Sequence, residues 1–208
     1  MISRYSELEA KLSKSFSRII GIDETNVCSY FGEVVVAGVI LPKVIPVKVN
    51  DSKKLSEESI NRIAQTIMKT CEYFIDYVTP RECDNSLLKS EYNAIKRLCN
   101  KAKPEVVLID FHSVPDRFHY LQCGVKGGDT ICWSIAAASI VARYIWNLKC
   151  KEYHKLYPEY NLIHNKGSFG NQLFNLTVKH GLTKHHRVEW IKSACIKKKI
   201  EFSKICRR

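Results

Sequence analysis

The sequence predicts an α/β fold. Short runs rich in β-branched and other apolar residues, such as residues 18–23, 33–41 and 105–110, have the length and composition of buried strands. Between them lie longer stretches in which apolar residues recur at helical spacing. Strands that alternate with helices along a chain are typical of α/β domains.

The first half of the chain predicts two helices and three strands. In order these are a polar amphipathic helix over 1–16, strands over 18–23 and 33–41, a helix from residue 56 to about 67, and a strand over 71–79. Ser56 can accept hydrogen bonds as the N-cap of the second helix, and Glu57 and Glu58 suit its first turn. The two strands before Ser56 are expected to be neighbours joined by a polar bend.

The second half predicts one more strand and several helices. In order these are a helix over about 81–100, a strand over 105–110, a long helix over 130–153, and helices near 170–180 and 186–199. Pro80 can open the first of these helices. Gly127 and Gly128 predict a turn before the long helix, and Asp129 can cap it. The centre of that helix is small and apolar, so we expect it to be buried.

Length and composition are those of a single globular domain over residues 1–208. The chain has 45% hydrophobic and 26% charged residues and no internal repeat, so nothing marks a domain boundary. No stretch approaches the roughly 20 apolar residues that cross a bilayer, and the opening residues lack an apolar signal core. We therefore expect no membrane partner and a cytoplasmic location.

The cysteines indicate a reducing environment. There are nine, an odd number, and none forms a C-x-x-C pair with the spacing of zinc or redox sites. Most lie in apolar or helical contexts, so we interpret them as reduced residues that fill the core.

The net charge of +12 favours a polyanionic partner. The excess is uneven, since residues 184–208 contain nine Lys or Arg and only two Glu. Such a surface binds phosphate backbones without reading sequence, with an affinity that falls as salt rises. A basic tail that only improves solubility is the alternative. Trp190 and Phe202, within the tail, favour contact with a nucleic acid.

Four acidic residues stand where strands end or helices begin. Asp23 and Glu24 end the first strand, Asp110 ends a later strand, and Asp129 follows the glycine turn. Active sites of α/β sheets form beyond the carboxyl ends of strands, so these acids are expected to converge. Taken singly, each has a simpler interpretation: a solvated turn for Asp23 and Glu24, an exposed strand end for Asp110, and a helix cap for Asp129.

Carboxylates that converge in one cleft repel each other unless cations lie between them. Hard oxygen ligands of this kind hold Mg²⁺ or Mn²⁺, and two such ions about 4 Å apart perform phosphodiester chemistry. The four acids therefore predict a divalent-metal site, with two ions expected when substrate is bound.

An ordered set of motifs resembles the type 2 ribonucleases H, the ribonuclease HII and HIII group. The motifs are Gly21-Ile22-Asp23-Glu24, Asp51-Ser52-Lys53-Lys54-Leu55, Leu108-Ile109-Asp110, Gly128-Asp129 followed by residues 134–143, and Tyr157-Pro158-Glu159-Tyr160 with Lys166-Gly167. They span about residues 18 to 190. A single motif could arise by chance, but five in this order at compatible spacing are highly specific.

The resemblance implies a ribonuclease H-like fold, in which helices flank a mixed five-stranded sheet. The catalytic core would cover about residues 17–155, and a helical C-terminal extension about 156–208. It also implies an endonuclease that cuts the RNA strand of RNA–DNA hybrids or of ribonucleotide-containing duplex DNA and leaves 5′-phosphates. Asp23, Glu24, Asp110 and Asp129 fall on the family's metal-binding acids. We expect a monomer without an obligate protein partner.

The resemblance also implies contacts with the nucleic-acid backbone. Ser52, Lys53, Lys54 and Lys166 fit phosphate contacts, although an exposed charged loop would look the same. Arg187 resembles the family's late His-Arg element, for which a backbone contact and a structural role are equally compatible.

Two departures from the family pattern affect substrate recognition. Asn26-Val27-Cys28 occupies the place of a Gly-Arg-Gly segment that grips the ribonucleotide, and Cβ atoms there obstruct close approach. Lys166-Gly167-Ser168 replaces a Lys-Gly-Tyr whose Tyr packs on the sugar at an RNA-to-DNA junction, unless Phe169 substitutes. We therefore expect hybrid tracts to be favoured over single embedded ribonucleotides.

Two alternatives remain at this level. Another nuclease of the same broad fold would share the acids but not the Asp51–Leu55 motif. A nucleic-acid-binding protein with lost or altered nuclease activity would gain little from four acids near phosphates.

Overall fold

The computed structural model describes residues 6–42, 55–110, 112–115 and 118–206. The helices are α1 (Glu7–Leu12), α2 (Glu57–Thr70), α3 (Pro80–Ala102), α4 (Gly128–Ile131), α5 (Trp133–Leu156), α6 (Leu162–Asn165), α7 (Asn171–His180) and α8 (Val188–Lys198), with 3-10 turns at Pro158–Tyr160 and Phe202–Lys204. The strands are β1 (Ile19–Thr25), β2 (Val34–Ile40), β3 (Glu72–Val78), β4 (Val106–Asp110) and β5 (Leu121–Val125).

The five strands form one mixed sheet with the order β3-β2-β1-β4-β5. β1 pairs antiparallel with β2 and parallel with β4, and β4 pairs parallel with β5. The predicted ribonuclease H-like arrangement of strands and flanking helices is therefore confirmed. The parallel pairing matters most for function, because it places the carboxyl ends of β1 and β4 at the same edge of the sheet.

Contacts between residues divide the chain into two compact units. Unit 1 consists of Met1–Thr25, Val35–Asp76 and Tyr92–Tyr144, and unit 2 consists of Asn26–Val34, Tyr77–Glu91 and Ile145–Arg208. The boundary at residue 144 falls inside α5 and precedes the end of the predicted core at about 155. The prediction of a single domain stays a prediction.

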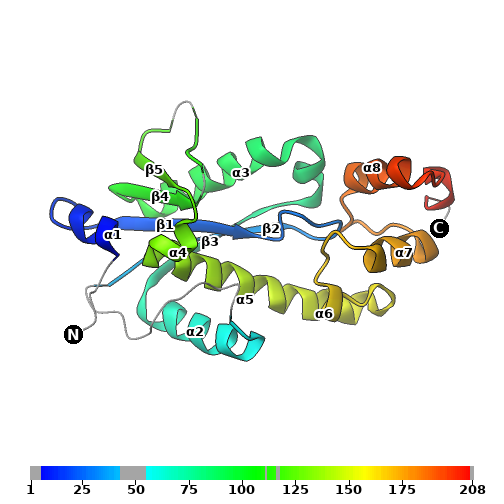
Figure 1. Ribbon diagram of the computed structural model, residues 1–208, viewed down its shortest axis with the longest axis horizontal. Coiled ribbons are helices and arrows are strands. Elements are labelled where there is room, and N and C mark those ends of the chain that lie inside the picture. Colours follow the sequence, from blue (N-terminus) through cyan, green and yellow to red (C-terminus); the bar gives the residue numbers. More distant parts are fainter. Residues whose placement is uncertain (1–5, 43–54, 111, 116–117, 207–208) are drawn as a thin grey trace. The chain divides into compact units, whose positions relative to one another are not determined.

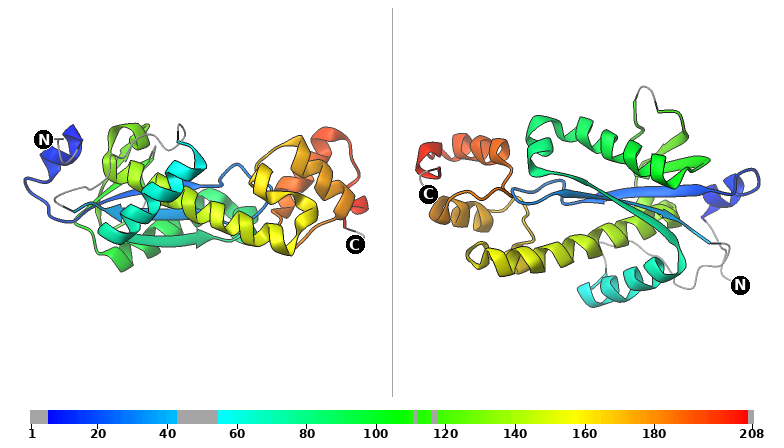
Figure 2. Two further views of the ribbon diagram at one scale, coloured as in Figure 1. Left: turned by 90° about the horizontal axis from the view of Figure 1, so that it is seen from below. Right: turned by 180° about the vertical axis from the view of Figure 1, so that it is seen from behind.

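In unit 1, helices cover both faces of the sheet (Figures 1 and 2). The first part of α5 lies on the face of Gly21, where an added Cβ would come within 2.3 Å of the Ser134 and Ile135 backbone. The last part of α3 lies on the other face, where a Cβ at Gly38 would come within 2.7 Å of Leu98. The two glycines therefore let helix and strand approach closely, and both strands are buried on both faces.

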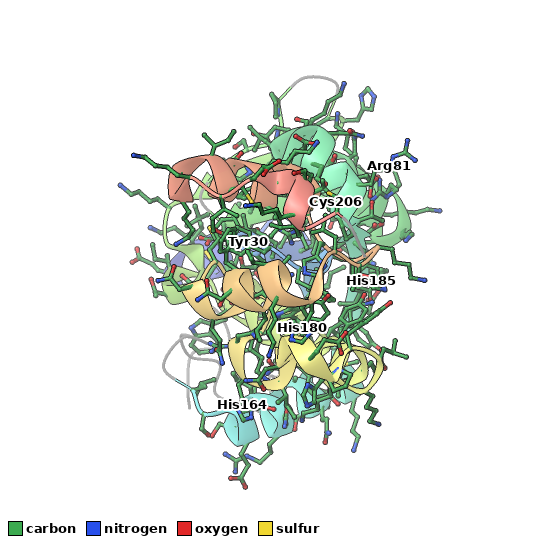
Figure 3. The ribbon with its side chains drawn as sticks, turned by 90° about the vertical axis from the view of Figure 1, so that its right-hand side faces the viewer. Tyr30, Arg81, His164, His180, His185 and Cys206 are labelled. Atoms are coloured by element: carbon green, nitrogen blue, oxygen red, sulfur yellow. The ribbon has the colours of Figure 1, made fainter. Side chains whose placement is uncertain are left out.

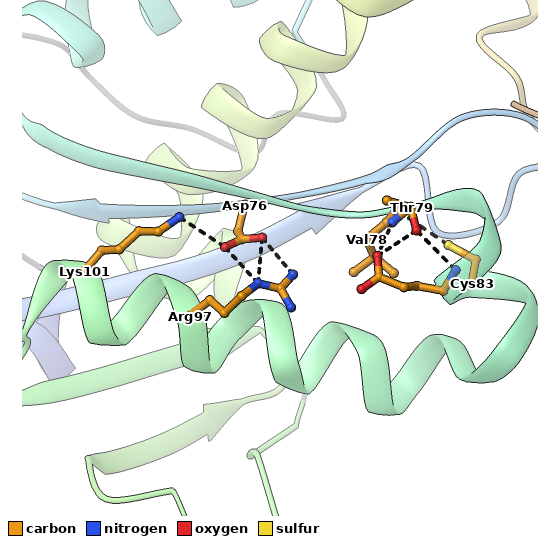
Figure 4. A network of polar contacts seen from close by, with 7 residues as sticks. Asp76, Val78, Thr79, Cys83, Arg97 and Lys101 are labelled. Atoms are coloured by element: carbon orange, nitrogen blue, oxygen red, sulfur yellow. Dashed lines mark hydrogen bonds and ion pairs between the residues drawn. The ribbon is translucent and has the colours of Figure 1, made fainter.

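A partly buried ion pair joins β3 to α3 within unit 1 (Figure 4). The Asp76 carboxylate, whose side chain is 10% exposed, accepts a hydrogen bond of 2.9 Å from Arg97 and lies 3.4 Å from Lys101 Nζ. Arg97 and Lys101 are four residues apart, so one face of α3 presents both cations to the same carboxylate. The pair fixes the position of α3 along the strand.

Unit 2 has a small apolar core of its own. Its buried members are Phe174 of α7, Ile191, Ala194 and Cys195 of α8, and Ile205. Tyr30 packs against this cluster, and Figure 3 shows it between α7 and α8. The core brings the segment before β2 together with the C-terminal helices.

Most elements begin and end close to their predicted residues. Ser56 caps α2 and accepts a hydrogen bond from Ser59 N, and α3 starts at Pro80, with a kink at Ser86. The capping prediction at Asp129 was wrong, because the N-cap of α4 is Gly127 and Asp129 lies in the first helical turn. Within the described residues, no helix combines the length and apolar character that a bilayer crossing requires.

Candidate active site

Asp23 and Asp110 end up as neighbours because two strands run parallel. The register pairs Ile22 of β1 with Ile109 of β4, and the next residue on each strand is the aspartate. Asp23 is 6% exposed, and Asp110 is half-buried at the last position of β4. Two carboxylates that are 87 positions apart in the sequence thus lie at the same edge of the sheet.

A tight turn brings Asp129 to the same edge. Gly127 adopts a positive φ of 69°, which glycine tolerates, and the next residue starts α4. The backbone N–H of Gly128 donates a hydrogen bond of 2.7 Å to Asp110 Oδ1. A Cβ at Gly128 would lie 3.2 Å from the same oxygen, so the turn rests directly on the Asp110 carboxylate. Asp129 follows and is 4% exposed.

The charges of Asp110 and Asp129 act on the carboxyl group of Asp23. Burial raises the pKa of Asp23 to about 7, and the negative charges of Asp110 and Asp129 act in the same direction. Hydrogen bonds from Ser139 and from the backbone N–H of Glu24 oppose this shift, because they stabilise the ionised carboxylate. The site therefore concentrates negative charge that a cation would stabilise.

Glu24, the fourth predicted acid, directly follows Asp23 on β1. Its backbone N–H donates a hydrogen bond of 2.8 Å to Asp23 Oδ1, and the residue is half-buried. Successive residues of a strand point to opposite faces, so the pleat alone does not bring both side chains to one point. The structure connects Glu24 to the site through its backbone.

The donor chemistry of the site fits Mg²⁺ or Mn²⁺, which prefer carboxylate oxygens. Among the described residues, however, no three His, Cys, Asp or Glu side chains are arranged to hold an ion by themselves. Mg²⁺ is commonly held by one or two carboxylates together with water and substrate phosphate, without a closed protein cage. An open group of aspartates is consistent with that mode of binding.

Ser139 was not predicted as a site residue. It lies on α5 and hydrogen-bonds the Asp23 carboxylate. The only signal in the sequence is a hydroxyl within the small apolar run 135–142, where every other residue is apolar. That signal becomes specific only once α5 is known to lie on the face of β1 that presents Asp23.

The predicted recognition residues Asn26, Val27 and Cys28 form a turn in unit 2. Asn26 adopts a positive φ of 66°, and its Nδ2 donates hydrogen bonds to the carbonyls of Phe31 at 2.9 Å and Glu33 at 2.8 Å. An Asn side chain that bonds its local backbone stabilises such a conformation. The turn is therefore ordered by Asn26 in a chain that lacks the glycines.

Arg187 binds backbone carbonyls of unit 2 through its side chain. Its side chain is completely buried, and it donates hydrogen bonds to the carbonyls of Asn26 and Val27 at 2.6 Å and of Gly32 at 3.0 Å. A guanidinium used in this way has no exposed donor for a phosphate. The sequence left a nucleic-acid contact and a structural role open for Arg187, and these bonds support the structural role, in which it stabilises the 26–28 turn.

The loop with Lys166 and Ser168 adjoins that turn within unit 2. Tyr30 N donates to Gly167 O at 3.0 Å, and Phe169 N donates to Cys28 O at 3.2 Å. Lys166 is half-buried, whereas Cys28 and Ser168 are exposed. The two segments that depart from the family pattern therefore form one continuous surface.

An aromatic pocket lies beside this surface and was not predicted. It has a volume of about 300 Å³ and is lined by residues of unit 2 that include Tyr30, Phe169, Trp190 and Lys197. Phe169 lies 4.6 Å from the Tyr30 ring and 4.8 Å from the Trp190 ring, measured between centroids. Phe169 thus packs on other aromatic rings, and 38% of it remains exposed.

Ser52, Lys53 and Lys54 lie outside the described residues. Their predicted contacts with phosphates stay predictions.

Comparison with known proteins identifies the family. The family model of ribonuclease HII, which describes the sequences of that family, matches residues 20–193. The ribonuclease HII of Caldanaerobacter subterraneus subsp. tengcongensis is 38% identical over 201 residues, which cover 91% of this chain and 82% of that protein. The chain belongs to the ribonuclease HII family. It is accordingly a hydrolase and an endonuclease of the ribonuclease H type, and this family acts on RNA–DNA hybrids with the help of divalent metals.

Solved structures of type 2 ribonucleases H share the fold. The ribonuclease H2 of Pyrococcus horikoshii matches with a TM-score of 0.72 and 17% identity, covering 88% of this chain and 98% of the other. A ribonuclease HIII, Bst-RNase HIII in complex with Mn²⁺, matches with a TM-score of 0.66 and 22% identity, covering 78% of this chain and 61% of the other. At identities of 17% and 22%, these likenesses show the shared fold alone.

Proposed function

We propose that this ribonuclease HII hydrolyses the RNA strand of RNA–DNA hybrids by two-metal-ion catalysis and leaves 5′-phosphate products. One observation supports this most directly: three aspartates from separate stretches of chain lie close enough for Asp110 and Asp129 to raise the pKa of Asp23. The proposed ligands are these three residues and Glu24. When bound, Mg²⁺ or Mn²⁺ would supply an activated water and stabilise the charge of the departing 3′-oxygen.

The protein's own groups orient the carboxylates. Ser139 donates to Asp23, and the N–H groups of Glu24 and Gly128 donate to Asp23 and Asp110. These bonds fix the direction of the Asp23 and Asp110 carboxylates before substrate arrives. Fixed dipoles of this kind reduce the reorganisation that the reaction requires.

Substrate contacts are proposed for two segments of unit 2. The exposed surface of Asn26, Val27, Cys28, Lys166 and Ser168 would face the hybrid, and Lys166 would offer a charge to a phosphate. Ser52, Lys53 and Lys54 are proposed to contact the backbone as well. Arg187 would contribute by keeping the turn in shape.

We propose that hybrid tracts are cleaved faster than a single ribonucleotide embedded in DNA. The 26–28 turn has side chains where glycines would let a ribose approach the backbone. Phe169 already packs against Tyr30 and Trp190, so a junction sugar would have to compete with these ring contacts. A longer tract compensates through additional backbone contacts that do not depend on this turn.

Cleavage-site mapping tests the proposal. Three end-labelled duplexes would be compared with Mg²⁺ and with Mn²⁺: a full hybrid, a chimeric RNA–DNA junction and a duplex with one ribonucleotide. We expect 5′-phosphate products, with the full hybrid cut fastest. Equal rates on the full hybrid and the single ribonucleotide would refute the preference, and tight binding without any cleavage would favour the binding-protein alternative.

A further inference from the structure

Glu9 is a buried carboxylate that lies outside the stretch matched by the family model. It belongs to α1, is 1% exposed, and precedes the matched residues 20–193. A carboxylate is seldom buried unless several donors satisfy it. The donors around Glu9 come from two different helices of unit 1.

Both oxygens of Glu9 accept hydrogen bonds. Oε2 accepts from the backbone N–H of Ser6 at 3.1 Å and of Trp133 at 3.0 Å, and Oε1 accepts from Ser134 N at 2.8 Å and Ser134 Oγ at 2.5 Å. One side chain therefore completes the capping box of α1 and also caps the first turn of α5. A negative charge at that end of a helix is favourable.

Apolar contacts hold α1 in the position that this capping requires. Leu8, Leu12 and Phe16 pack against a core cluster that contains Cys132 and Ile135. These two residues flank the first turn of α5. The carboxylate is thus fixed from both sides, by its own helix and by the helix that it caps.

The first turn of α5 packs directly on β1, the strand that carries Asp23. A Cβ at Gly21 would lie 2.4 Å from Ser134 Oγ, so the hydroxyl held by Glu9 occupies the space that a side chain would take. Gly21 and Asp23 are two apart on β1 and face the same side of the sheet. Five residues beyond Ser134, Ser139 hydrogen-bonds Asp23. The position of α5 on β1 therefore sets that bond.

The contact between Ser134 and Gly21 also limits the position of Asp129. α4 ends at Ile131, and only Cys132 separates it from α5. With so short a connection, a shift of the first turn of α5 is transmitted to α4. Asp129 and Ser139 therefore both depend on where Glu9 holds Trp133 and Ser134.

We propose that Glu9 is a positioning residue of the metal site. By capping α5 and holding Ser134 against Gly21, it sets Asp129 and Ser139 relative to Asp23 and thereby the affinity of the site for divalent cations. Glu9 touches neither the substrate nor the ions. The inference rests on the proposed metal-binding role of the aspartates.

The test compares Glu9→Gln with Glu7→Gln. Glutamine keeps the shape of Glu9 but turns an NH₂ group toward backbone N–H donors. Glu7 lies on the same helix, its side chain is 86% exposed, and it pairs with Lys11 on the surface. Mn²⁺ binding to the substrate-free proteins would be measured by calorimetry, and kcat and KM on a full hybrid by initial rates. Circular dichroism would verify folding.

We expect Glu9→Gln to weaken Mn²⁺ binding and lower kcat by roughly 10- to 100-fold, as the loss of groups that orient metal ligands does. KM for the hybrid should stay within about twofold, since no substrate contact is removed. Glu7→Gln should match the wild type. A folded Glu9→Gln protein that binds Mn²⁺ and turns over like Glu7→Gln would overturn the proposal.

Ser134→Ala provides a second route to the same answer, since it removes only the hydroxyl that Glu9 binds. Its effect should have the same direction, and the double variant should be no worse than the more affected single variant, because both act through one contact. If Glu9→Gln does not fold, an unchanged Mn²⁺ affinity of Ser134→Ala overturns the inference. Failure of the wild type to cleave hybrids would instead refute the proposed function, and the Mn²⁺ comparison would still test Glu9.

Discussion

The aspartate site of unit 1 and the 26–28 turn of unit 2 are held in place in different ways. Strand register and close helix packing on Gly21 position the aspartates. The turn has no regular structure of its own, and its shape depends on hydrogen bonds from Asn26 and Arg187 to backbone carbonyls. Side-chain changes at the aspartates should therefore alter chemistry and spare the fold, whereas changes at the turn's supports should alter the fold first.

The largest effect is expected for Asp110→Asn. Removing a proposed metal ligand takes away several kcal/mol of transition-state stabilisation, which corresponds to a loss of activity of about 1000-fold or more. The fold should survive, because the amide oxygen can still accept the hydrogen bond from Gly128 N. Hybrid cleavage and hybrid binding would both be measured.

The exposed Glu58→Gln on α2 is the matched control, and it should behave like the wild type. Cleavage by Asp110→Asn within tenfold of the wild type would remove Asp110 from the chemistry.

Unlike Asp110→Asn, the substitution Arg187→Met is expected to lower stability. Three carbonyl groups would lose their buried donor, which should lower the free energy of unfolding by about 3 kcal/mol or more. Urea denaturation would measure this change. The exposed Lys184→Met should leave the free energy of unfolding within about 0.5 kcal/mol of the wild type.

A contrary result has a definite meaning. If Arg187→Met kept full stability but bound hybrids with a weaker salt dependence, Arg187 would be a phosphate contact after all.

Acid should destabilise the surroundings of the turn through His186. Burial lowers the pKa of His186 to about 3, and its Nδ1 accepts a hydrogen bond of 2.9 Å from Thr183 N. Folding therefore stabilises the neutral ring: this contribution is complete above the unfolded pKa of 6.5 and is lost as pH falls from 6.5 toward 3. At about pH 5, the free energy of unfolding should fall by up to about 1.4 kcal/mol for each unit that the pH falls.

The measurement is the free energy of unfolding at several pH values, for the wild type and for His186→Asn. The Asn oxygen can accept the bond from Thr183 but cannot titrate. Equal pH slopes in the two proteins would show that other groups cause the acid sensitivity.

The smallest effect is expected for Asn26→Gly. Glycine relieves the strain of the positive φ but loses two side-chain hydrogen bonds. The free energy of unfolding should therefore change by no more than about 1 kcal/mol. Asn26→Ala loses the same bonds without relieving the strain and should cost about 1 kcal/mol more than the glycine variant. Thermal unfolding of both would sharpen the comparison, and equal losses would show that the strain is negligible.

Local patterns predicted much of the fold and the order of the candidate acids. Ser56 and Pro80 signalled helix starts because capping and ring geometry act within a few residues. β5 was not found by pattern, since only Val125 of its five residues is buried and no alternation is visible. The strand forms because β4 offers it a partner.

The remaining errors come from contacts between distant parts of the chain. Asp129 looked like a helix cap, but the cap of α5 is supplied by Glu9, more than 120 residues earlier. For Arg187 the sequence left a backbone contact and a structural role open, because nothing near it in sequence reveals that it donates to the carbonyls of residues 26, 27 and 32. Local sequence does not encode which donors meet which acceptors across such distances.

Gly21 has a consequence for protein engineering. Replacing glycine by alanine is a common way to raise thermal stability, because it restricts the unfolded chain and gains about 0.4–1 kcal/mol where the site has room. Here the new methyl group would meet helix backbone at 2.3 Å. A stabilised variant of this enzyme should therefore leave position 21 unchanged and take its substitutions from the exposed helix faces.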